Sequence, residues 1–428
     1  MVTLEQILGY ENMLNACKAV IRNKGSAGID GVKCQDLVKW FYDHPYIVSK
    51  SIEDGSFKPS PIKRVYIPKD NGEKRPLGIS TTVDRTVQNA IANKLIELYD
   101  PKFSDSSFGF RPGRGCHGAV NRVLQYANEG YIYVVDMDLA KFFDTVNHSK
   151  LLQVLSNEIK DGRVISLIHR YLRVKIIDGN KAIKNKVGLH LGNNFSPVCA
   201  NILLNELDQE LEKRGVKFVR YADDCMLFAK SERAARRILE STTRFIEEKL
   251  FLKVNLDKTS VGKLGYDTKF LGFGFRNTKD GWTTVLHKKS RKKFVEKMRT
   301  ILTRRCPKGI EKTRNTYNTF LRGWYQYFKP CISKSTMKTE EQWIRRRIRQ
   351  ILIVAWKRNY TCYKNLLGYT KGKQEEHCRM VAFSHLGKWA KAKHSNYILT
   401  NKLLHRELGW QCVADLVEGY TVQDQYFV

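Results

Sequence analysis

The sequence predicts an α+β fold, in which a region with an antiparallel sheet precedes an all-helical and strongly basic region. The first observation is a series of short runs rich in β-branched and aromatic residues and bounded by turn residues. The second is that helical stretches lie between these runs. The third comes from the last third of the chain. From Lys288 onward the apolar spacing is helical, and many of the residues between are Lys or Arg.

The first 130 residues predict helices around a single hairpin. Apolar positions at helical spacing predict a helix over residues 4–25. The glycine-rich stretch that follows lacks the Gly-Lys-Ser/Thr ending of a nucleotide-binding P-loop, so we expect an ordinary loop there. The run RVYIPKDNGEKRPLGIS predicts a hairpin with Asp70, Asn71 and Gly72 at its turn, and residues 81–100 predict a helix.

The middle of the chain alternates strands and helices. We expect a strand over residues 131–136, a helix from near Lys141, and a hairpin that turns near Ala222. Ser196 is the expected N-cap of a long helix from about Pro197. The remaining elements are helices over 149–158 and 164–172, an amphipathic helix ending in a strand over 236–255, and a strand over 269–275.

Charge and composition limit the partners of this chain. Its 428 residues include 75 Lys and Arg against 43 Asp and Glu, a net charge of +32. Such self-repulsion opposes compaction unless a polyanion is bound, which favours nucleic acid over an anionic membrane surface. We see no apolar run near the roughly 20 residues of a membrane span and no signal peptide, so we expect a soluble, cytoplasmic protein. The ten cysteines lack Cys-x-x-Cys spacing, which argues against a zinc site or a disulfide framework.

The positive charge is concentrated in the last third of the chain. From His287 onward there are 31 basic and 10 acidic residues, a net charge of +21. Helical stretches in this region interleave arginine with aromatic residues, which suits phosphate contact and base stacking. A solvated helix face is the alternative for each stretch. One stretch presents Trp343 with Arg345, Arg346, Arg347 and Arg349.

The stretch FVRYADDCMLFAK places Asp223 and Asp224 side by side between two apolar runs. Ala-Asp is a poor hairpin turn, and unpaired carboxylates in a low dielectric are costly. A solvated acidic turn and a bound divalent cation are the two explanations. A second acidic strand end, with Asp136 and Asp138 on one face, lies in the same sheet-forming region. Three converging carboxylates can hold two Mg²⁺ ions about 4 Å apart, which in a strongly basic chain indicates nucleotidyl transfer.

Six motifs of the sequence resemble the ordered motifs of group II intron reverse transcriptases, also called maturases. They are IPKDNGEKRPLGI, SFGFRPGRGCHGAV, DLAKFFDTVNH, YADD, FLGFGF and LRGWYQYF. The resemblance runs from about Leu4 to the C-terminus. It is to the bacterial type without an endonuclease domain, because we find no His/Cys cluster of the HNH type.

The resemblance implies a right-hand polymerase, with a fingers and palm region, a helical thumb (the maturase X domain) and a C-terminal DNA-binding region. We therefore expect an N-terminal extension and fingers over residues 1–130 and a palm with inserted helices over 131–286. The thumb is expected over 287–365 and the DNA-binding region over 366–428.

The resemblance also implies roles for individual residues. Asp138, Asp223 and Asp224 match the catalytic, metal-binding aspartates. Phe143 matches the aromatic residue that excludes a ribose 2′-hydroxyl, with simple core packing as the alternative. Asp136 is the alternative to Asp138 as a metal ligand, but its spacing to Phe143 does not match the family.

Further residues are expected at the substrates. Lys69 and Arg75 match residues that grip the incoming triphosphate, and ordinary surface charges on a hairpin are the alternative. Leu191 and Gly192 complete the expected dNTP pocket. The residues expected to bind nucleic acid are Arg111, Arg322, Trp324, Arg345, Arg346 and Arg349. The implied cofactor is a pair of Mg²⁺ ions, which Mn²⁺ can replace. The implied partners are an RNA template, intron RNA, a DNA primer or target, and dNTPs, with no membrane and no obligatory protein partner.

One stretch departs from the family pattern. The family usually has Gly-Thr-Pro-Gln-Gly-Gly-x-x-Ser-Pro where this chain has GLHLGNNFSP, so the replaced positions are Leu189, His190, Leu191 and Asn193. The family glutamine makes a polar contact near the nascent base pair, and Leu191 cannot hydrogen-bond. Two functions therefore stay open: an RNA-directed DNA polymerase, and an RNA-binding splicing maturase with weak or lost polymerase activity. A reverse transcriptase recruited to host defence or repair is a third, which sequence does not separate.

Overall fold

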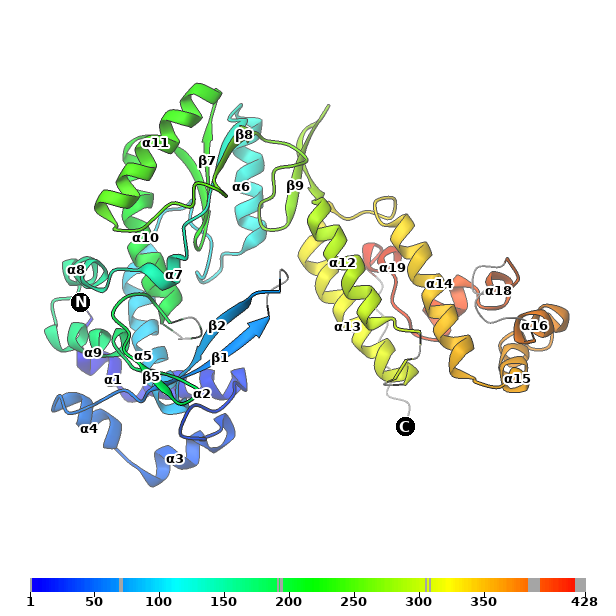
Figure 1. Cartoon of the computed structure of the whole chain (residues 1–428), viewed down its shortest axis with the longest axis horizontal. Coiled ribbons are helices and arrows are strands. Elements are labelled where there is room, and N and C mark those ends of the chain that lie inside the picture. The colour runs from blue at the N-terminus through cyan, green and yellow to red at the C-terminus, as the bar shows by residue number, and fades with distance from the viewer. Residues whose placement is uncertain are drawn as a thin grey trace. The chain divides into compact units, whose positions relative to one another are not determined.

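The computed structural model describes residues 2–68, 72–190, 192, 195–304, 306–307, 309–383 and 393–419. It combines sheets with many helices, which confirms the predicted α+β class. The chain forms two compact units, Met1–Lys263 and Leu264–Val428, and Figure 1 labels many of their elements.

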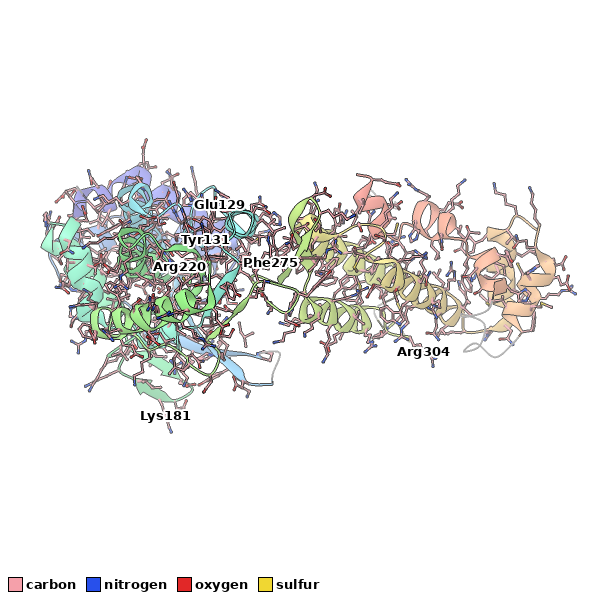
Figure 2. All side chains as sticks on the ribbon, turned by 90° about the horizontal axis from the view of Figure 1, so that it is seen from above. Glu129, Tyr131, Lys181, Arg220, Phe275 and Arg304 are labelled. Atoms are coloured by element: carbon pink, nitrogen blue, oxygen red, sulfur yellow. The ribbon has the colours of Figure 1, made fainter. Side chains whose placement is uncertain are left out.

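One four-stranded sheet of the first unit has the order β2-β1-β4-β5. Its strands are β1 (Ile62–Pro68), β2 (Lys74–Ile79), β4 (Ile176–Asp178) and β5 (Lys181–Ile183). The β1–β2 pair confirms the predicted hairpin, although Asp70 and Asn71 of its expected turn lie outside the described residues. β1 also pairs in parallel with β4. Lys181 projects outward from the β4–β5 hairpin in Figure 2.

The second four-stranded sheet has the order β6-β7-β3-β8, and all of its pairs are antiparallel. Its strands are β3 (Tyr133–Met137), β6 (Lys217–Tyr221), β7 (Asp224–Ala229) and β8 (Ser260–Lys263). The structure confirms the predicted strand β3 and the predicted β6–β7 hairpin. Strand β8 was not predicted, because its four residues carry little of the apolar alternation that marks a strand.

Helices surround these sheets. They are α1 (Leu4–Leu8), α2 (Tyr10–Asn23), η1 (Cys34–Asp36), α3 (Leu37–Asp43), α4 (Ile47–Glu53), α5 (Thr82–Tyr99), η2 (Asp100–Lys102), α6 (Cys116–Asn128), α7 (Phe142–Thr145), α8 (His148–Glu158), α9 (Gly162–Leu172), α10 (Ser196–Lys213) and α11 (Glu232–Lys249). The single helix expected over residues 4–25 is wrong. Gly9 takes an extended ψ of 138° and separates α1 from α2.

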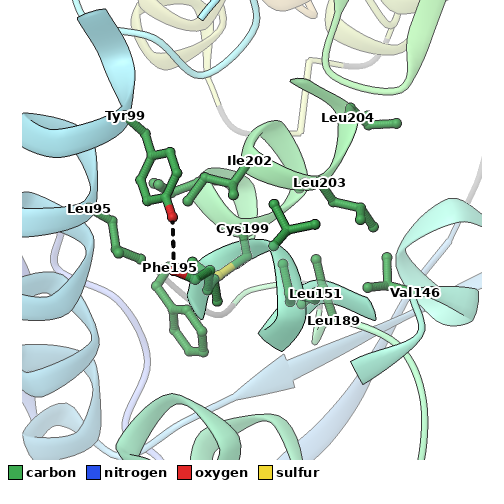
Figure 3. Packing of buried hydrophobic residues seen from close by; sticks show 14 of the residues in the cluster. Leu95, Tyr99, Val146, Leu151, Leu189, Phe195, Cys199, Ile202, Leu203 and Leu204 are labelled. Carbon is green, nitrogen blue, oxygen red and sulfur yellow. Dashed lines mark hydrogen bonds between the residues drawn. The ribbon is translucent and has the colours of Figure 1, made fainter. Parts of the chain in front are cut away.

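The long helix α10 passes through the core of the first unit. Cys199, Ile202 and Leu203 are at most 1% exposed, and they lie in one cluster with Leu95 and Tyr99 of α5 (Figure 3). The helix begins at Ser196, so the prediction of Ser196 as its N-cap is wrong by one residue. Phe195 occupies that position, and no side chain caps the helix there.

The second unit begins with a two-stranded hairpin and continues as helices. Its elements are β9 (Phe273–Thr278), β10 (Gly281–Leu286), α12 (Lys288–Ile301), α13 (Ile310–Phe328), η3 (Lys329–Cys331), α14 (Lys338–Ala355), α15 (Asn359–Tyr369), α16 (Glu375–Ala382), α18 (Lys393–Ile398), η4 (Leu403–Glu407) and α19 (Val413–Val417). The helical region from Lys288 is as predicted. Strand β10 was not predicted, although the Asp280-Gly281 pair where it begins is a hairpin-turn signal. Among the described residues, no helix has the length and apolarity needed to span a bilayer.

Candidate active site

The second sheet brings the predicted aspartates together at one end of its central strands, β3 and β7. Met137 of β3 lies opposite Cys225 of β7 in an antiparallel register. Extending that register by one residue places Asp138 opposite Asp224. Tyr221 pairs with Asp224 across the β6–β7 hairpin, so Asp223 lies in its two-residue turn. The three aspartates therefore lie at neighbouring positions, although 85 residues of sequence separate Asp138 from Asp223.

A buried arginine, Arg220, hydrogen-bonds to the backbone of this turn. Arg220 is 1% exposed, and its Nε and Nη2 donate to the carboxylate of Asp208 at 2.7 and 2.5 Å. Its Nη1 donates to Asn201 Oδ1 at 2.9 Å and to the carbonyl oxygen of Ala222 at 3.0 Å. Ala222 has φ +56°, a left-handed conformation that is uncommon outside glycine. The bond to its carbonyl thus stabilises a backbone shape that the turn sequence disfavours.

The segment before α6 closes around the same turn. A Cβ atom on Gly109 would lie 2.3 Å from the backbone nitrogen of Ala222, so only glycine fits there. Asn201 Nδ2 donates to the Gly109 carbonyl at 2.7 Å. Arg111 is buried, and its guanidinium donates to the Asp100 carboxylate and to the backbone carbonyls of Ser104 and Ser107. The prediction that Arg111 contacts nucleic acid is therefore corrected: its donors organise this loop.

The segment after α11 supports Asp138, and sequence reasoning missed it. Asn255 Nδ2 donates to Asp138 Oδ2 at 2.9 Å, and the Asn255 backbone N–H donates to the Asp138 carbonyl at 2.8 Å. Lys258 Nζ lies 3.7 Å from the same Oδ2, and the Asp138 N–H donates to Thr259 Oγ1 at 3.2 Å. No residue type in the sequence NLDKT predicts by itself a contact with Asp138. Only the fold brings it to Asp138.

The surroundings of Asp223 disfavour its charged form. Burial raises the pKa of Asp223, and the charge of Asp138 raises it further. The Asp223 backbone amide, Arg75 and Arg220 lower that pKa. Asp224 is exposed. A cation at this end of the strands would relieve the repulsion between Asp138 and Asp223.

The donor set fits Mg²⁺ in kind. All three expected ligands are carboxylates, the hard oxygen donors that Mg²⁺ prefers. In the described parts of the chain, no three His, Cys, Asp or Glu side chains converge closely enough to form a complete metal cage. Mg²⁺ is usually held by one or two carboxylates together with substrate phosphates, so a complete protein cage is not required.

The β1–β2 hairpin and the loop before α10 approach each other. Arg75 on β2 is exposed, and its charge acts on Asp223. Gly192 has φ +94°, and a Cβ atom there would lie 2.5 Å from the carbonyl oxygen of Gly78 on β2. Gly192 therefore serves backbone packing against this strand. Lys69 and Leu191, both expected at the dNTP, lie outside the described residues.

The residues just before Leu191 are anchored to α7. The Gly188 N–H donates to the Val146 carbonyl at 2.8 Å, and the Leu189 N–H donates to the Phe143 carbonyl at 2.6 Å. His148 Nε2 lies 2.8 Å from the Gly188 carbonyl. The Leu189 side chain is 3% exposed and joins the core cluster of Figure 3. A leucine at the position of the family threonine thus fixes this part of the loop in the core.

His190 takes the position of the family proline. Burial lowers its pKa to about 4, and His148 and Arg64 lower it in the same direction. The ring is therefore neutral at pH 7, and its Nε2 lies 3.2 Å from Asn185 Nδ2, which can donate to it.

Phe143 lies beside a cavity of about 230 Å³ between α7, the β1–β2 hairpin and the Gly188 loop. The ring is half-buried and packs edge-on against Phe142 at 5.2 Å. The Phe143 side chain therefore packs partly against the core and also lines this cavity. The cavity lining also includes Arg64, Leu77, Gly78, Asn185, Leu189 and His190.

In the second unit, the expected nucleic-acid residues fall into two groups. Trp324 is half-buried and packs between Phe294 and Phe328, with ring centroids 4.2 and 5.1 Å away. Arg322 is half-buried on the same helix. The other group, all on α14, lines one polar cavity: Arg345, Arg346 and Arg349.

Comparison with known proteins gives two family matches. Residues 67–275 match "Reverse transcriptase (RNA-dependent DNA polymerase)", and residues 291–369 match "Group II intron, maturase-specific domain". Protein YkfC of Escherichia coli (strain K12) is 31% identical over 309 residues, which cover 63% of this chain and 81% of YkfC. The group II intron-encoded protein LtrA of Lactococcus lactis subsp. cremoris is 28% identical over 299 residues, which cover 55% of this chain and 50% of LtrA. The chain thus spans about half the length of LtrA.

Proposed function

The chain belongs to the group II intron reverse transcriptases and maturases, and from that premise we propose that it is an RNA-directed DNA polymerase that also binds intron RNA to assist splicing and retromobility. The observation that carries the proposal is the placement of Asp138 opposite Asp224, with Asp223 in the adjacent turn. The proposed arrangement is an N-terminal extension and fingers over residues 1–130, a palm over 131–286, a helical thumb over 287–365 and a C-terminal DNA-binding region over 366–428.

The three aspartates are proposed to hold two Mg²⁺ ions, with Mn²⁺ as a substitute. When bound, the ions would lower the pKa of the primer 3′-hydroxyl and stabilise the leaving pyrophosphate. Asn255 orients the Asp138 carboxylate through its 2.9 Å hydrogen bond. Arg220 fixes the Ala222 carbonyl and thereby the backbone that carries Asp223. Both groups preorganise the carboxylates before any substrate arrives.

The substrate contacts follow from the same end of the sheet. Arg75 is exposed and electrostatically coupled to Asp223, a position from which a guanidinium can grip the triphosphate of a dNTP. Lys69 is proposed to act with it. Phe143, beside the cavity at α7, is proposed to exclude the 2′-hydroxyl of a ribonucleotide by contact.

A second candidate function is a splicing maturase with weak polymerase activity. The observation that favours it is Leu191 in the place of a glutamine, since leucine offers no polar contact to the nascent base pair. The proposed RNA-binding surface on α14 does not depend on this loop.

Primer extension on an RNA template tests the proposal. Asp223→Ala removes a proposed metal ligand and is expected to abolish extension while leaving RNA binding intact. Asp43→Ala, an exposed aspartate at the end of α3, is the matched control and should extend like the parent. Extension by Asp223→Ala at the parental rate would refute the assignment. Parental protein that binds RNA but extends no primer would favour the splicing maturase.

A further inference from the structure

A polar cavity of about 600 Å³ lies within the second unit, between α14 and residues 396–401. One wall comes from α14 and the other from α18 and the residues just after it. All the described residues of its lining are polar or charged: Gln342, Arg345, Arg346, Arg349, Asn396, Thr400 and Asn401. Apolar walls are typical of sites for small organic ligands, so this lining points to a charged ligand.

The deepest cation of the cavity has no carboxylate partner. Arg349 is 4% exposed, and its Nε and Nη2 donate to the Leu399 carbonyl at 2.8 Å and to Asn401 Oδ1 at 3.0 Å. Within the part of the chain that the structure describes, no Asp or Glu forms an ion pair with it. Burial, followed by the charge of Arg345, lowers the pKa of Arg349 to about 10. A buried and uncompensated charge is costly, and an anion in the cavity would compensate it.

The carboxylate that pairs with Arg345 is also engaged elsewhere. Glu341 Oε2 lies 3.5 Å from Arg345 Nη1. The other oxygen, Oε1, accepts from the backbone N–H groups of Val413 at 2.6 Å and Ala414 at 3.1 Å, at the start of α19. Arg346 is exposed, and its Nε donates a 3.4 Å hydrogen bond to the Gln342 carbonyl. The cavity lining thus has three guanidinium groups, and the carboxylate that pairs with Arg345 is shared with another element.

We propose that this cavity is a discrete binding site for one phosphate group of a bound RNA. Guanidinium groups match the geometry of phosphate oxygens through paired N–H donors, and the amides of Asn396 and Asn401 add neutral polar groups on the opposite wall. Helix α14 lies within the residues that match the maturase-specific domain. The inference rests on the proposed RNA binding but is independent of polymerase activity.

Two sources of the phosphate share this chemistry: a phosphodiester within the RNA chain and a phosphate at its 5′ end. The measurement is fluorescence anisotropy of the full chain with a single-stranded RNA 20-mer, labelled at its 3′ end, over a range of salt concentrations. One RNA carries a 5′-hydroxyl and the other a 5′-monophosphate. A loss seen with both RNAs identifies a phosphodiester, and a loss confined to the second identifies the terminal phosphate.

Two variants address opposite walls of the cavity. Arg346→Gln removes a charge that pairs with no Asp or Glu among the described residues, so the fold should tolerate it. It is expected to weaken RNA binding by roughly three- to tenfold and to make the slope of log K against log salt shallower by about 0.7, as for one lost phosphate contact on a single strand. Asn396→Asp places a negative charge on the other wall without changing the shape, and it should weaken binding as well.

The matched controls carry the same chemical changes outside the cavity. Arg358→Gln lies just before α15, and Asn315→Asp lies on α13; both residues are exposed. The controls should keep the parental affinity and salt slope. Equal losses in Arg346→Gln and Arg358→Gln would overturn the site, because they would report only net charge. Parental affinity in both cavity variants would overturn it too. Primer extension by Arg346→Gln at saturating RNA is read separately, so loss of polymerase activity cannot be mistaken for loss of this site.

Discussion

Arg220→Met is predicted to destabilise the hairpin that carries Asp223. The arginine and its partner Asp208 are 1% and 0% exposed on their side chains. Methionine fills a similar volume but leaves the Asp208 charge buried without compensation, which costs about 3–5 kcal/mol. The Ala222 carbonyl and Asn201 Oδ1 lose a donor as well. These losses share one network and do not simply add, so we expect a total of about 3–5 kcal/mol.

The double variant Arg220→Met with Asp208→Leu separates charge from packing. Replacing a buried ion pair by apolar residues of similar volume is often neutral or stabilising. We therefore expect the double variant to recover most of the lost stability. The Ala222 carbonyl still lacks its donor in this variant, so primer extension should stay low even though the fold is restored.

Amide hydrogen exchange of β6 and β7 in the full chain is the assay, because it reports the local free energy of opening. Protection of these strands should fall in Arg220→Met and return in the double variant. A single variant with opening free energies within about 1 kcal/mol of the parent would refute the reasoning. Full primer extension by the double variant would show that the Ala222 contact does not position Asp223.

Three further predictions concern the site itself. Phe143→Ala should incorporate rNTPs more readily, as measured by the ratio of kcat/KM for dNTP and rNTP; an unchanged ratio would mean that Phe143 only packs. Asp223→Asn should unfold at higher urea than the parent at neutral pH without divalent cations. The raised pKa of Asp223 means that its charged form is disfavoured in the fold, so stability is highest when the group is protonated and falls as pH rises through the folded pKa. The difference between variant and parent should vanish in acid, and a less stable variant at pH 7 would contradict this sign. His190→Pro with Leu191→Gln should lower the KM for dNTPs by several-fold to roughly tenfold, because a polar contact worth about 0.5–1.5 kcal/mol is regained. An unchanged or higher KM would mean that the pocket has been remodelled around leucine.

The sequence predicted the elements at the site better than the contacts that hold them. Strand β3 and the β6–β7 hairpin were predicted from local apolar runs, and the structure confirms them. The pairing of Arg220 with Asp208 was not predictable, because both charges look like ordinary surface residues of a strand and a helix. Arg111 shows the opposite error, since an arginine in a loop of a basic chain suggested nucleic acid but is buried in backbone contacts.

Local rules fail for a physical reason in these cases. Helix and strand signals depend on neighbours within a few residues, whereas the partners of Asp138 come from a segment 117 to 121 residues away. Asn255 supports Asp138 only because β3 and the chain after α11 run beside each other. The sequence around Asn255 does not predict that this segment lies next to Asp138.

The turn at Ala222 shows how tertiary contacts can override poor turn chemistry. A left-handed alanine costs about 1–3 kcal/mol, and burial with Asp138 nearby disfavours the charge of Asp223. Against these costs stand the hydrogen bond from Arg220 to the Ala222 carbonyl and the close backbone approach that only Gly109 permits. These tertiary contacts hold the turn in its strained shape. The adjacent aspartates are held in an unfavourable position by the fold, and the repulsion that remains between Asp223 and Asp138 is what a bound cation would relieve.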